Sequence, residues 1–270
     1  MTLANPQQLE AINHNQGPLL IIAGPGSGKT FTLVERVINL IQKHSIGPDA
    51  LFVVTFTEKA AQELTTRISN RLLELGIEFN INEMFLGTFH SICLRIIEDY
   101  REYTRLKRSF VLMDQFDQQY FLYQNLNDFR QIDNVDQILG SDKTPVWAKS
   151  ENLLQWINKV TEEAIDHQRL IESNDEALIA LGECYDLYQR KLDEHNALDF
   201  STIQLEALNL LRNHSVVLEL LKDRIQYLMI DEYQDTNTIQ EMILKLLMGD
   251  GQNLCVVGDD DQALYRFRGA

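Results

Sequence analysis

The chain has 270 residues, of which 44% are hydrophobic and 24% are charged, and its formal net charge is −16. This length is enough for one large domain or two ordinary domains with buried cores. No apolar run approaches the roughly 18 residues that a membrane helix needs, and the first residues have neither a basic stretch nor an apolar core. We therefore expect no contact with a membrane and no secretory signal.

The cysteines and the overall charge narrow the class of protein further. Cys93, Cys184 and Cys255 are far apart and form no C-x-x-C pair, which argues against a disulfide framework or a zinc site and indicates reduced thiols in a cytoplasmic protein. The sequence pI near 4.7 by itself points away from nucleic acid, whose binders usually carry a basic face. Charges more than about 8 Å apart are largely screened at physiological salt, so a local groove on an acidic body can still hold DNA.

The N-terminal part of the chain alternates short apolar runs with amphipathic helical patterns. Strands are expected at 19–23, 51–55 and 85–88, and a helical pattern follows each of them. Thr57 is the expected N-cap of the second of these helices. This alternation predicts an α/β fold with a parallel sheet that is covered on both faces.

The first strand leads into a glycine-rich turn that ends in Lys-Thr. The turn consists of Ala23, Gly24, Pro25, Gly26, Ser27, Gly28, Lys29 and Thr30. Glycines allow successive backbone N–H groups to point into one cavity, and the helix that begins at Lys29 adds the positive end of its dipole. Lys29 can reach the β- and γ-phosphates, and Thr30 can offer its hydroxyl to Mg²⁺. We expect this turn to bind a nucleoside triphosphate, although Ala23 replaces the first glycine of the general pattern.

The middle of the chain differs in character. From about residue 114 to 196 the patterns are helical, with no strand between them. The apolar stripes are Phe116, Tyr120 and Tyr123; Leu153, Trp156, Ile157, Val160 and Ala164; and Leu178, Leu181, Tyr185, Tyr188 and Leu192. We interpret the aromatic residues at this spacing as core. Strand patterns return at 227–231 and 253–257, on either side of a helix near 239–248, so an α/β domain is expected to carry an all-helical insertion.

The strand at 227–231 ends in two carboxylates, Asp231 and Glu232. At the carboxyl edge of a parallel sheet beside the phosphate loop, Asp231 can hold Mg²⁺, directly or through water. Glu232 can orient and deprotonate the water that attacks the γ-phosphate. A strand ending in Asp-Glu is a modest signal alone and a strong one behind a phosphate loop.

A series of motifs follows one order along the chain: Gln8, AGPGSGKT, TFTEKAAQEL, GTFHS, IDEYQDTN and GDDDQALYRFRGA. Together they resemble the UvrD/Rep/PcrA family of superfamily 1 DNA helicases, from the first residues to the last. The resemblance implies a RecA-like P-loop NTPase sheet with an inserted helical subdomain. The first part of the ATP-binding domain is then expected at 1–110, the helical insertion at 111–196 and the second part at 197–270. ATP and Mg²⁺ are the implied cofactors.

The resemblance also implies roles for single residues. Gln8 matches a glutamine that reads the adenine edge, and Gln262 matches one that senses the γ-phosphate and couples hydrolysis to DNA. Without the family, a surface residue at a helix start is the preferred interpretation of Gln8, and 259–261 is more often a solvated turn. The matching DNA-contact positions are Phe56, Thr88, His90, Tyr265 and Phe267.

The DNA-contact positions have alternatives of their own. Aromatic faces stack on any base, at about 1–3 kcal/mol per base, but Phe56 follows a buried strand and core packing is a serious alternative for it. A metal-ligand role for His90 is not expected, because no second ligand is spaced to join it. The densest basic run, Arg95, Arg101, Arg105, Lys107 and Arg108, either touches phosphates or forms a solvated helix face.

The chain departs from the family pattern in several places. Phe31 stands where many relatives have Arg, Glu58 replaces the usual Asn, and Phe267 replaces a common Trp. The sequence also stops directly after the Gln262 motif, whereas family members continue into a second motor domain that supplies arginines to the γ-phosphate. We therefore expect a piece of a longer protein whose C-terminal motor domain is missing here.

The resemblance implies the N-terminal half of an ATP-dependent DNA helicase. Such an enzyme would act on single-stranded DNA and duplex junctions, and the family's role in DNA repair is implied with it. Unwinding with 3′-to-5′ polarity is implied by the family alone. The alternatives are the motor part of a helicase–nuclease subunit, a non-catalytic ATP-binding interaction module, and a P-loop ATPase acting on protein. Glu232 and Gln262 favour an enzyme, because a pure binder has no need of a catalytic base.

Overall fold

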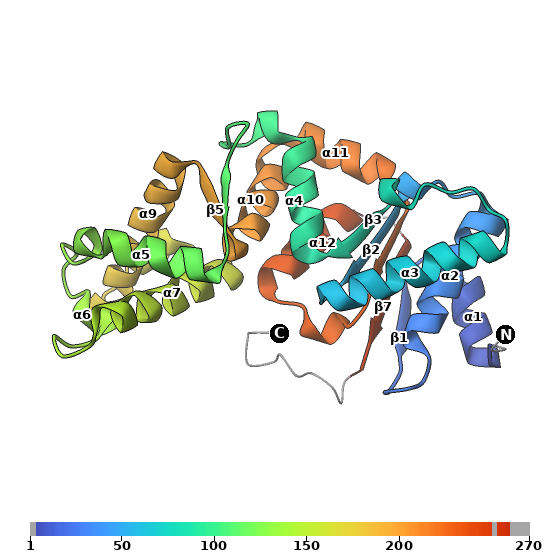
Figure 1. Ribbon diagram of the computed structural model, residues 1–270, viewed down its shortest axis with the longest axis horizontal. Coiled ribbons are helices and arrows are strands. Elements are labelled where there is room, and N and C mark those ends of the chain that lie inside the picture. The colour runs from blue at the N-terminus through green and yellow to red at the C-terminus, as the bar shows by residue number, and fades with distance from the viewer. Residues whose placement is uncertain (1–3, 250–252, 260–270) are drawn as a thin grey trace. The chain divides into compact units, whose positions relative to one another are not determined.

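The computed structural model describes residues 4–249 and 253–259. Its chain forms two compact units, Met1–Arg95 with Leu211–Ala270 and Ile96–Leu210, which are described separately below (Figure 1). Gln262, Tyr265 and Phe267 lie outside the described residues. The domain boundaries expected after 110 and after 196 remain a prediction.

The first unit is built on a five-stranded parallel sheet with the strand order β1-β7-β6-β2-β3. Its strands are β1 (Leu19–Ile22), β2 (Leu51–Thr55), β3 (Phe85–Thr88), β6 (Tyr227–Ile230) and β7 (Asn253–Gly258). β1 therefore pairs with the strand farthest from it in sequence, with Leu19 opposite Cys255. The α/β parallel-sheet fold expected from the sequence is confirmed.

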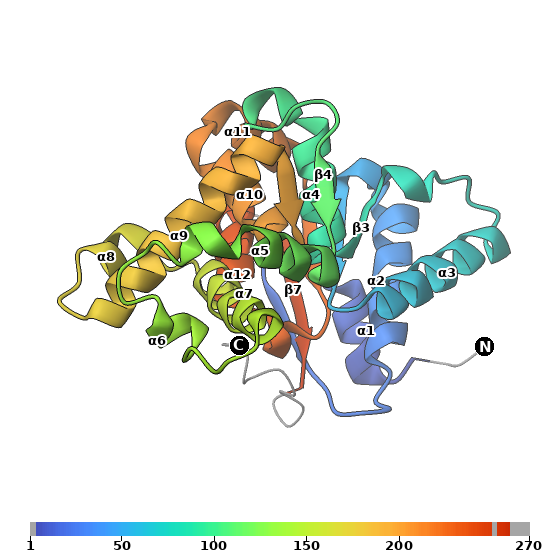
Figure 2. The same ribbon diagram turned by 60° about the vertical axis from the view of Figure 1, so that its left-hand side comes forward.

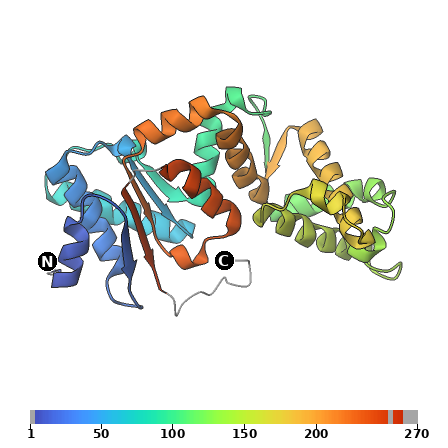
Figure 3. The ribbon, with the colours of Figure 1, turned by 180° about the vertical axis from the view of Figure 1, so that it is seen from behind.

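Helices cover the centre of this sheet on both faces. The helices of this unit are α1 (Pro6–Asn13), α2 (Lys29–His44), α3 (Glu58–Glu74), α4 (Phe89–Asp99), which continues past Arg95, α11 (Ser215–Arg224) and α12 (Thr238–Met248), with short 3₁₀ turns at Pro48–Ala50, Ile81–Glu83 and Tyr233–Asp235. α2 and α3 lie side by side on one face (Figure 2), and α12 lies on the other (Figure 3). Covering both faces explains why the central strands are continuous apolar runs.

The apolar stripes of α2 and α3 form the core on their side of the sheet. Leu33 and Val37 of α2 and Leu64 and Ile68 of α3 pack against inward side chains of the strands, such as Val53. Thr57 begins α3 as expected, because its hydroxyl accepts the N–H of Ala60 at 3.2 Å. The β1 edge is less covered, and Leu20 and Ile22 remain exposed.

The second unit is mostly helical. Its helices are α5 (Gln115–Phe129), α6 (Asp136–Leu139), α7 (Val146–Glu162), α8 (His167–Ile171), α9 (Glu176–His195) and α10 (Phe200–Asn213), of which α10 continues past Leu210. A 3₁₀ turn at Arg101–Tyr103 precedes two three-residue strands of this unit, β4 (Val111–Met113) and β5 (Ala197–Asp199), which pair in parallel. The sequence did not indicate this ladder, because three residues are too few to show a period of two.

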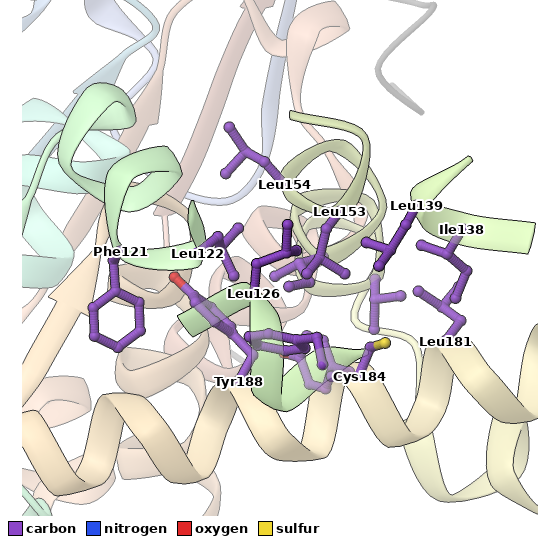
Figure 4. Close-up of a cluster of buried hydrophobic side chains, with 14 of the residues drawn as sticks. Phe121, Leu122, Leu126, Ile138, Leu139, Leu153, Leu154, Leu181, Cys184 and Tyr188 are labelled. Carbon is purple, nitrogen blue, oxygen red and sulfur yellow. The ribbon is translucent and has the colours of Figure 1, made fainter. Parts of the chain in front are cut away.

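Figure 4 shows the core of this helical unit. Phe121, Leu122 and Leu126 of α5 meet Leu153 of α7 and Tyr188 of α9. The expectation that Phe116, Tyr120 and Tyr123 belong to the core is wrong, since all three are exposed, as are Trp156 and Leu178. α5 carries two stripes with helical spacing, and the period alone does not determine which of them faces inward.

The three cysteines are buried free thiols, and burial raises the pKa of Cys93 and Cys184 to about 12.

Among the described residues, no helix combines the length and the apolar character that crossing a membrane requires.

Candidate active site

The loop between β1 and α2 has a backbone that only glycine adopts easily. Gly26 and Gly28 have φ values of +72° and +87°, in the left-handed region. A Cβ on Gly28 would lie 2.7 Å from the side-chain nitrogen of Gln8, so a larger residue would also collide there. Ser27 Oγ donates to the carbonyl of Gly24 at 2.6 Å and closes the loop on itself.

Lys29 begins α2 directly behind this loop. The N-cap, Gly28, provides no side-chain acceptor, so the first N–H groups of the helix are available to a ligand. Together with the helix dipole, this geometry suits a phosphate group. Strand, loop and helix start thus have the arrangement that the sequence predicted.

The catalytic candidates Lys29 and Glu232 are in direct contact. Lys29 Nζ donates to Glu232 Oε2 at 3.0 Å, and the same oxygen accepts the amide of Gln234 at 2.8 Å. The side-chain oxygen of Gln234 in turn accepts the backbone N–H of Asp259 at 3.0 Å. This chain of contacts joins the phosphate loop, the end of β6 and the end of β7.

The backbone explains how Glu232 reaches back toward Lys29. Glu232 has φ +52°, a left-handed conformation that costs of order 1 kcal/mol for a residue other than glycine. The chain turns sharply there, from β6 into the 3₁₀ turn Tyr233–Asp235. Such strain is typical of functional sites, where the surrounding structure holds the residue in place.

Asp231 lies beside Glu232 and is almost fully buried, at 8% exposure. Burial, followed by the charge of Glu232, raises the pKa of Asp231 to about 6. A buried carboxylate and a threonine hydroxyl are oxygen ligands of the kind that Mg²⁺ accepts, so Asp231 and Thr30 fit a magnesium site.

Phe31 borders a cavity at the loop and a larger cavity beyond it. A cavity of about 250 Å³ is lined by Gly26, Gly28, Lys29, Thr30, Phe31 and Arg67. A larger one of about 560 Å³ lies between α1, α2 and α3, and Phe31 forms part of its wall as well. Phe31, at the start of α2, therefore lines both cavities.

Gln8 belongs to the loop environment rather than to an isolated surface helix. Its backbone and side chain form a capping box with Asn5 at the start of α1. Its side-chain nitrogen donates to the carbonyl of Ser27 at 3.0 Å. One N–H of the amide remains for a ligand, since the group has two.

The described DNA-contact candidates differ in burial and in their polar partners. Phe56 is half-buried, and Thr88 is buried with its hydroxyl donating to Glu58 at 3.0 Å. Burial lowers the pKa of His90 to about 4, so this side chain is neutral at physiological pH. In the basic run, Arg105 pairs with Asp193 at 2.8 Å and with Glu206 at 3.2 Å, which supports a structural role for it.

The sequence reasoning missed two residues. Gln234, which links Glu232 to Asp259, stands inside the IDEYQDTN motif, so its position was a usable signal. Arg67 lines the phosphate-loop cavity from α3, and only the packing of α3 against α2 places it there. Asp259 is buried, which disagrees with a solvated turn at that residue.

Comparison with known proteins agrees with this geometry. Residues 4–270 match the family of the UvrD/REP helicase N-terminal domain. The chain is 36% identical over 269 residues to a Staphylococcus epidermidis protein named ATP-dependent DNA helicase PcrA, and 34% identical to the Staphylococcus aureus protein of the same name. Each alignment covers 98% of this chain and 34% of the relative, so the chain spans about a third of the length of these relatives. The chain belongs to the UvrD/REP helicase N-terminal domain family.

Proposed function

We propose that this chain is the N-terminal motor portion of an ATP-dependent DNA helicase, which couples ATP hydrolysis to movement along single-stranded DNA. The observation that carries the proposal is the contact between Lys29, at a phosphate-binding loop, and Glu232, at the end of a neighbouring strand. Duplex unwinding, its 3′-to-5′ polarity and the binding of junctions belong to the whole protein in this proposal, and the second motor domain would have to complete the site.

In the proposed reaction, water attacks the γ-phosphate in line with the leaving group. The N–H groups of the loop and the start of α2 hold the phosphates, while Lys29 neutralises charge on them. An incoming γ-phosphate competes with Glu232 for the Lys29 ammonium, because both are anions. Release from Lys29 frees Glu232 to accept a proton from water, and Gln234 keeps it oriented.

Thr30 and Asp231 are the residues that would hold Mg²⁺. When bound, the ion would offset the charge on the phosphate oxygens. It would also relieve the cost of an ionised Asp231, which is buried beside Glu232.

We assign the nucleotide base and the DNA strand to different residues. We assign the adenine edge to Gln8, which contacts the loop through Ser27. Gln262 would sense the γ-phosphate. DNA bases would stack on Phe56, Tyr265 and Phe267, His90 would be a further contact, and Thr88 would support the start of α3 through Glu58.

The first test is the binding of a fluorescent ATP analogue with Mg²⁺. Lys29→Ala should weaken binding at least about tenfold, because a charge-assisted contact with phosphate is lost. Lys43→Ala is the matched control, since it removes the same charge from the last turn of the same helix. Glu232→Gln should bind ATP about as tightly as the unchanged chain.

Oligo(dT) binding and ATP hydrolysis complete the test. Phe56→Ala should weaken oligo(dT) binding. Whatever rate of ATP hydrolysis the unchanged chain shows, Glu232→Gln should show none. Equal ATP affinity in Lys29→Ala and Lys43→Ala would refute the phosphate site. Normal ATP binding without oligo(dT) binding would refute the DNA assignment and favour a nucleotide-binding interaction module.

A further inference from the structure

The helical unit carries a group of aromatic side chains on its surface. We call Phe116, Tyr120 and Tyr123 of α5 and Trp147 of α7 the aromatic patch. Their exposures are 64%, 46%, 41% and 38%. α5 and α7 lie side by side (Figure 1), and both contribute other side chains to the core in Figure 4, so the patch is a second apolar face of the same helices.

The four rings contact one another. Phe116 and Tyr120 are stacked with their centroids 6.4 Å apart and an angle of 3° between the rings, and Tyr120 and Tyr123 are stacked at 6.3 Å. Trp147 joins the two ends, at 5.9 Å from Phe116 and 5.5 Å from Tyr123. Contiguous exposed apolar surface of this kind marks interaction sites more often than scattered single residues do.

The hydroxyls of the patch are also available. In the part of the chain that the structure describes, the hydroxyls of Tyr120 and Tyr123 form no hydrogen bond. Tyrosine and tryptophan present apolar faces together with a polar edge, which makes them frequent anchors of protein interfaces.

The charge around the patch is negative. Between Ile96 and Leu210, Asp and Glu outnumber Lys and Arg two to one, compared with 40 to 24 in the whole chain. α5 contains no Lys or Arg, and Asp117 follows Phe116 directly. Glu151 lies one turn along α7 from Trp147, whereas Lys149 is buried, 3.9 Å from Asp136.

Aromatic faces in a negative field bind cations. A guanidinium or ammonium group over an aromatic ring is attracted by the negative face of the ring, and nearby carboxylates add to the attraction. Nucleic acid is disfavoured, because its phosphates would meet Asp117 and Glu151 with no Lys or Arg of α5 to offset them.

We infer that the aromatic patch is a docking site for an arginine- or lysine-bearing segment of a partner protein. The rings bind the cationic side chains by their faces, and the acidic surface of the helical unit attracts the segment from solution. This inference concerns the second unit alone and does not depend on the proposed nucleotide chemistry.

The test uses Trp147 as its own reporter. The chain has two tryptophans, so Trp156→Phe leaves Trp147 as the only one. The full chain with this change is titrated with a short acetylated peptide of alternating Arg and Gly. The same peptide with citrulline in place of Arg keeps the shape of the side chain and removes its charge. Oligo(dT) is the nucleic-acid probe.

A saturable change in Trp147 fluorescence is expected with the arginine peptide and not with the citrulline peptide. Replacing Tyr120 and Tyr123 by Ala should weaken binding roughly five- to thirtyfold, as the loss of two exposed cation–π contacts predicts. Leu178→Ala removes an exposed apolar side chain from α9 of the same unit and should leave the affinity unchanged.

Three results would overturn the inference. Oligo(dT) binding that the Tyr120 and Tyr123 changes weaken and that Phe56→Ala leaves unchanged would assign the patch to nucleic acid. Self-association that the Tyr120 and Tyr123 changes abolish, measured by sedimentation at several concentrations, would assign it to a second copy of the chain. No fluorescence change with the arginine peptide, in a chain whose circular dichroism shows it to be folded, would leave the patch without this function.

Discussion

The adjacent carboxylates at the end of β6, Asp231 and Glu232, differ in exposure and in pairing because their surroundings differ. Glu232 is partly exposed and paired with Lys29, whereas Asp231 is buried and has a pKa raised to about 6, mainly by burial. Since the folded state holds this proton more tightly than the unfolded chain does, the contribution of Asp231 to stability falls as the pH rises from about 4 to about 6.

Asp231→Asn should remove this pH dependence. Above pH 6 the variant should be more stable than the unchanged chain by up to about 3 kcal/mol, because it no longer ionises a buried group. Urea unfolding of both proteins at pH 5 and pH 7.5, without nucleotide or Mg²⁺, measures the difference. If the free energies of unfolding of the two proteins differ by the same amount at both pH values, Asp231 ionises without a penalty. The variant should also bind Mg²⁺ with ATP more weakly.

At the scale of single elements, the phosphate loop shows what a local sequence can specify. Its glycines adopt left-handed φ values, and Gly28 also leaves the room that the Gln8 side chain fills. Backbone freedom is a local property, but the contact with Gln8 comes from a different helix, α1.

Gly28→Ala should therefore lower ATP affinity by more than the left-handed φ of this residue alone explains. We expect it to weaken ATP binding at least about tenfold, because the Gln8 amide must move away from the added Cβ and lose its hydrogen bond to Ser27, while the loop keeps a strained φ. Gly76→Ala is the matched control: its φ is +66°, but no atom lies within 4 Å of the added Cβ. That change should cost about 1 kcal/mol of stability and leave ATP affinity unchanged. Equal ATP affinity in the two variants would show that the Gln8 contact is unimportant.

At the scale of the whole molecule, the chain has two units with separate cores. The sheet unit contains the phosphate loop and both carboxylates, whereas the core around Leu126 belongs to the helical unit. This division predicts that damage to one core spares binding by the other unit.

Leu126→Ala tests this independence. Removing this buried side chain should destabilise the helical unit by about 2–5 kcal/mol. Hydrogen exchange followed by peptide mass spectrometry should show faster exchange in α5, α7 and α9, with little change in β2 and α2. Affinity for a fluorescent ATP analogue should stay within about twofold, and a larger loss would show that the units fold as one.

Residues close together in the sequence determined much of the local structure of this protein. The phosphate loop, the bounds of β2 and β3, the Thr57 cap and the carboxylates after β6 all follow from local patterns, since turns, caps and strand ends depend on neighbouring residues. Only the tertiary structure decided which distant groups meet. Lys29 reaches Glu232 because parallel pairing brings β1, β7 and β6 together in that order, and Gln234 then joins Glu232 to Asp259. It also decided which stripe of α5 is buried: Phe121, Leu122 and Leu126 face α7 and α9, while the equally periodic Phe116, Tyr120 and Tyr123 remain at the surface.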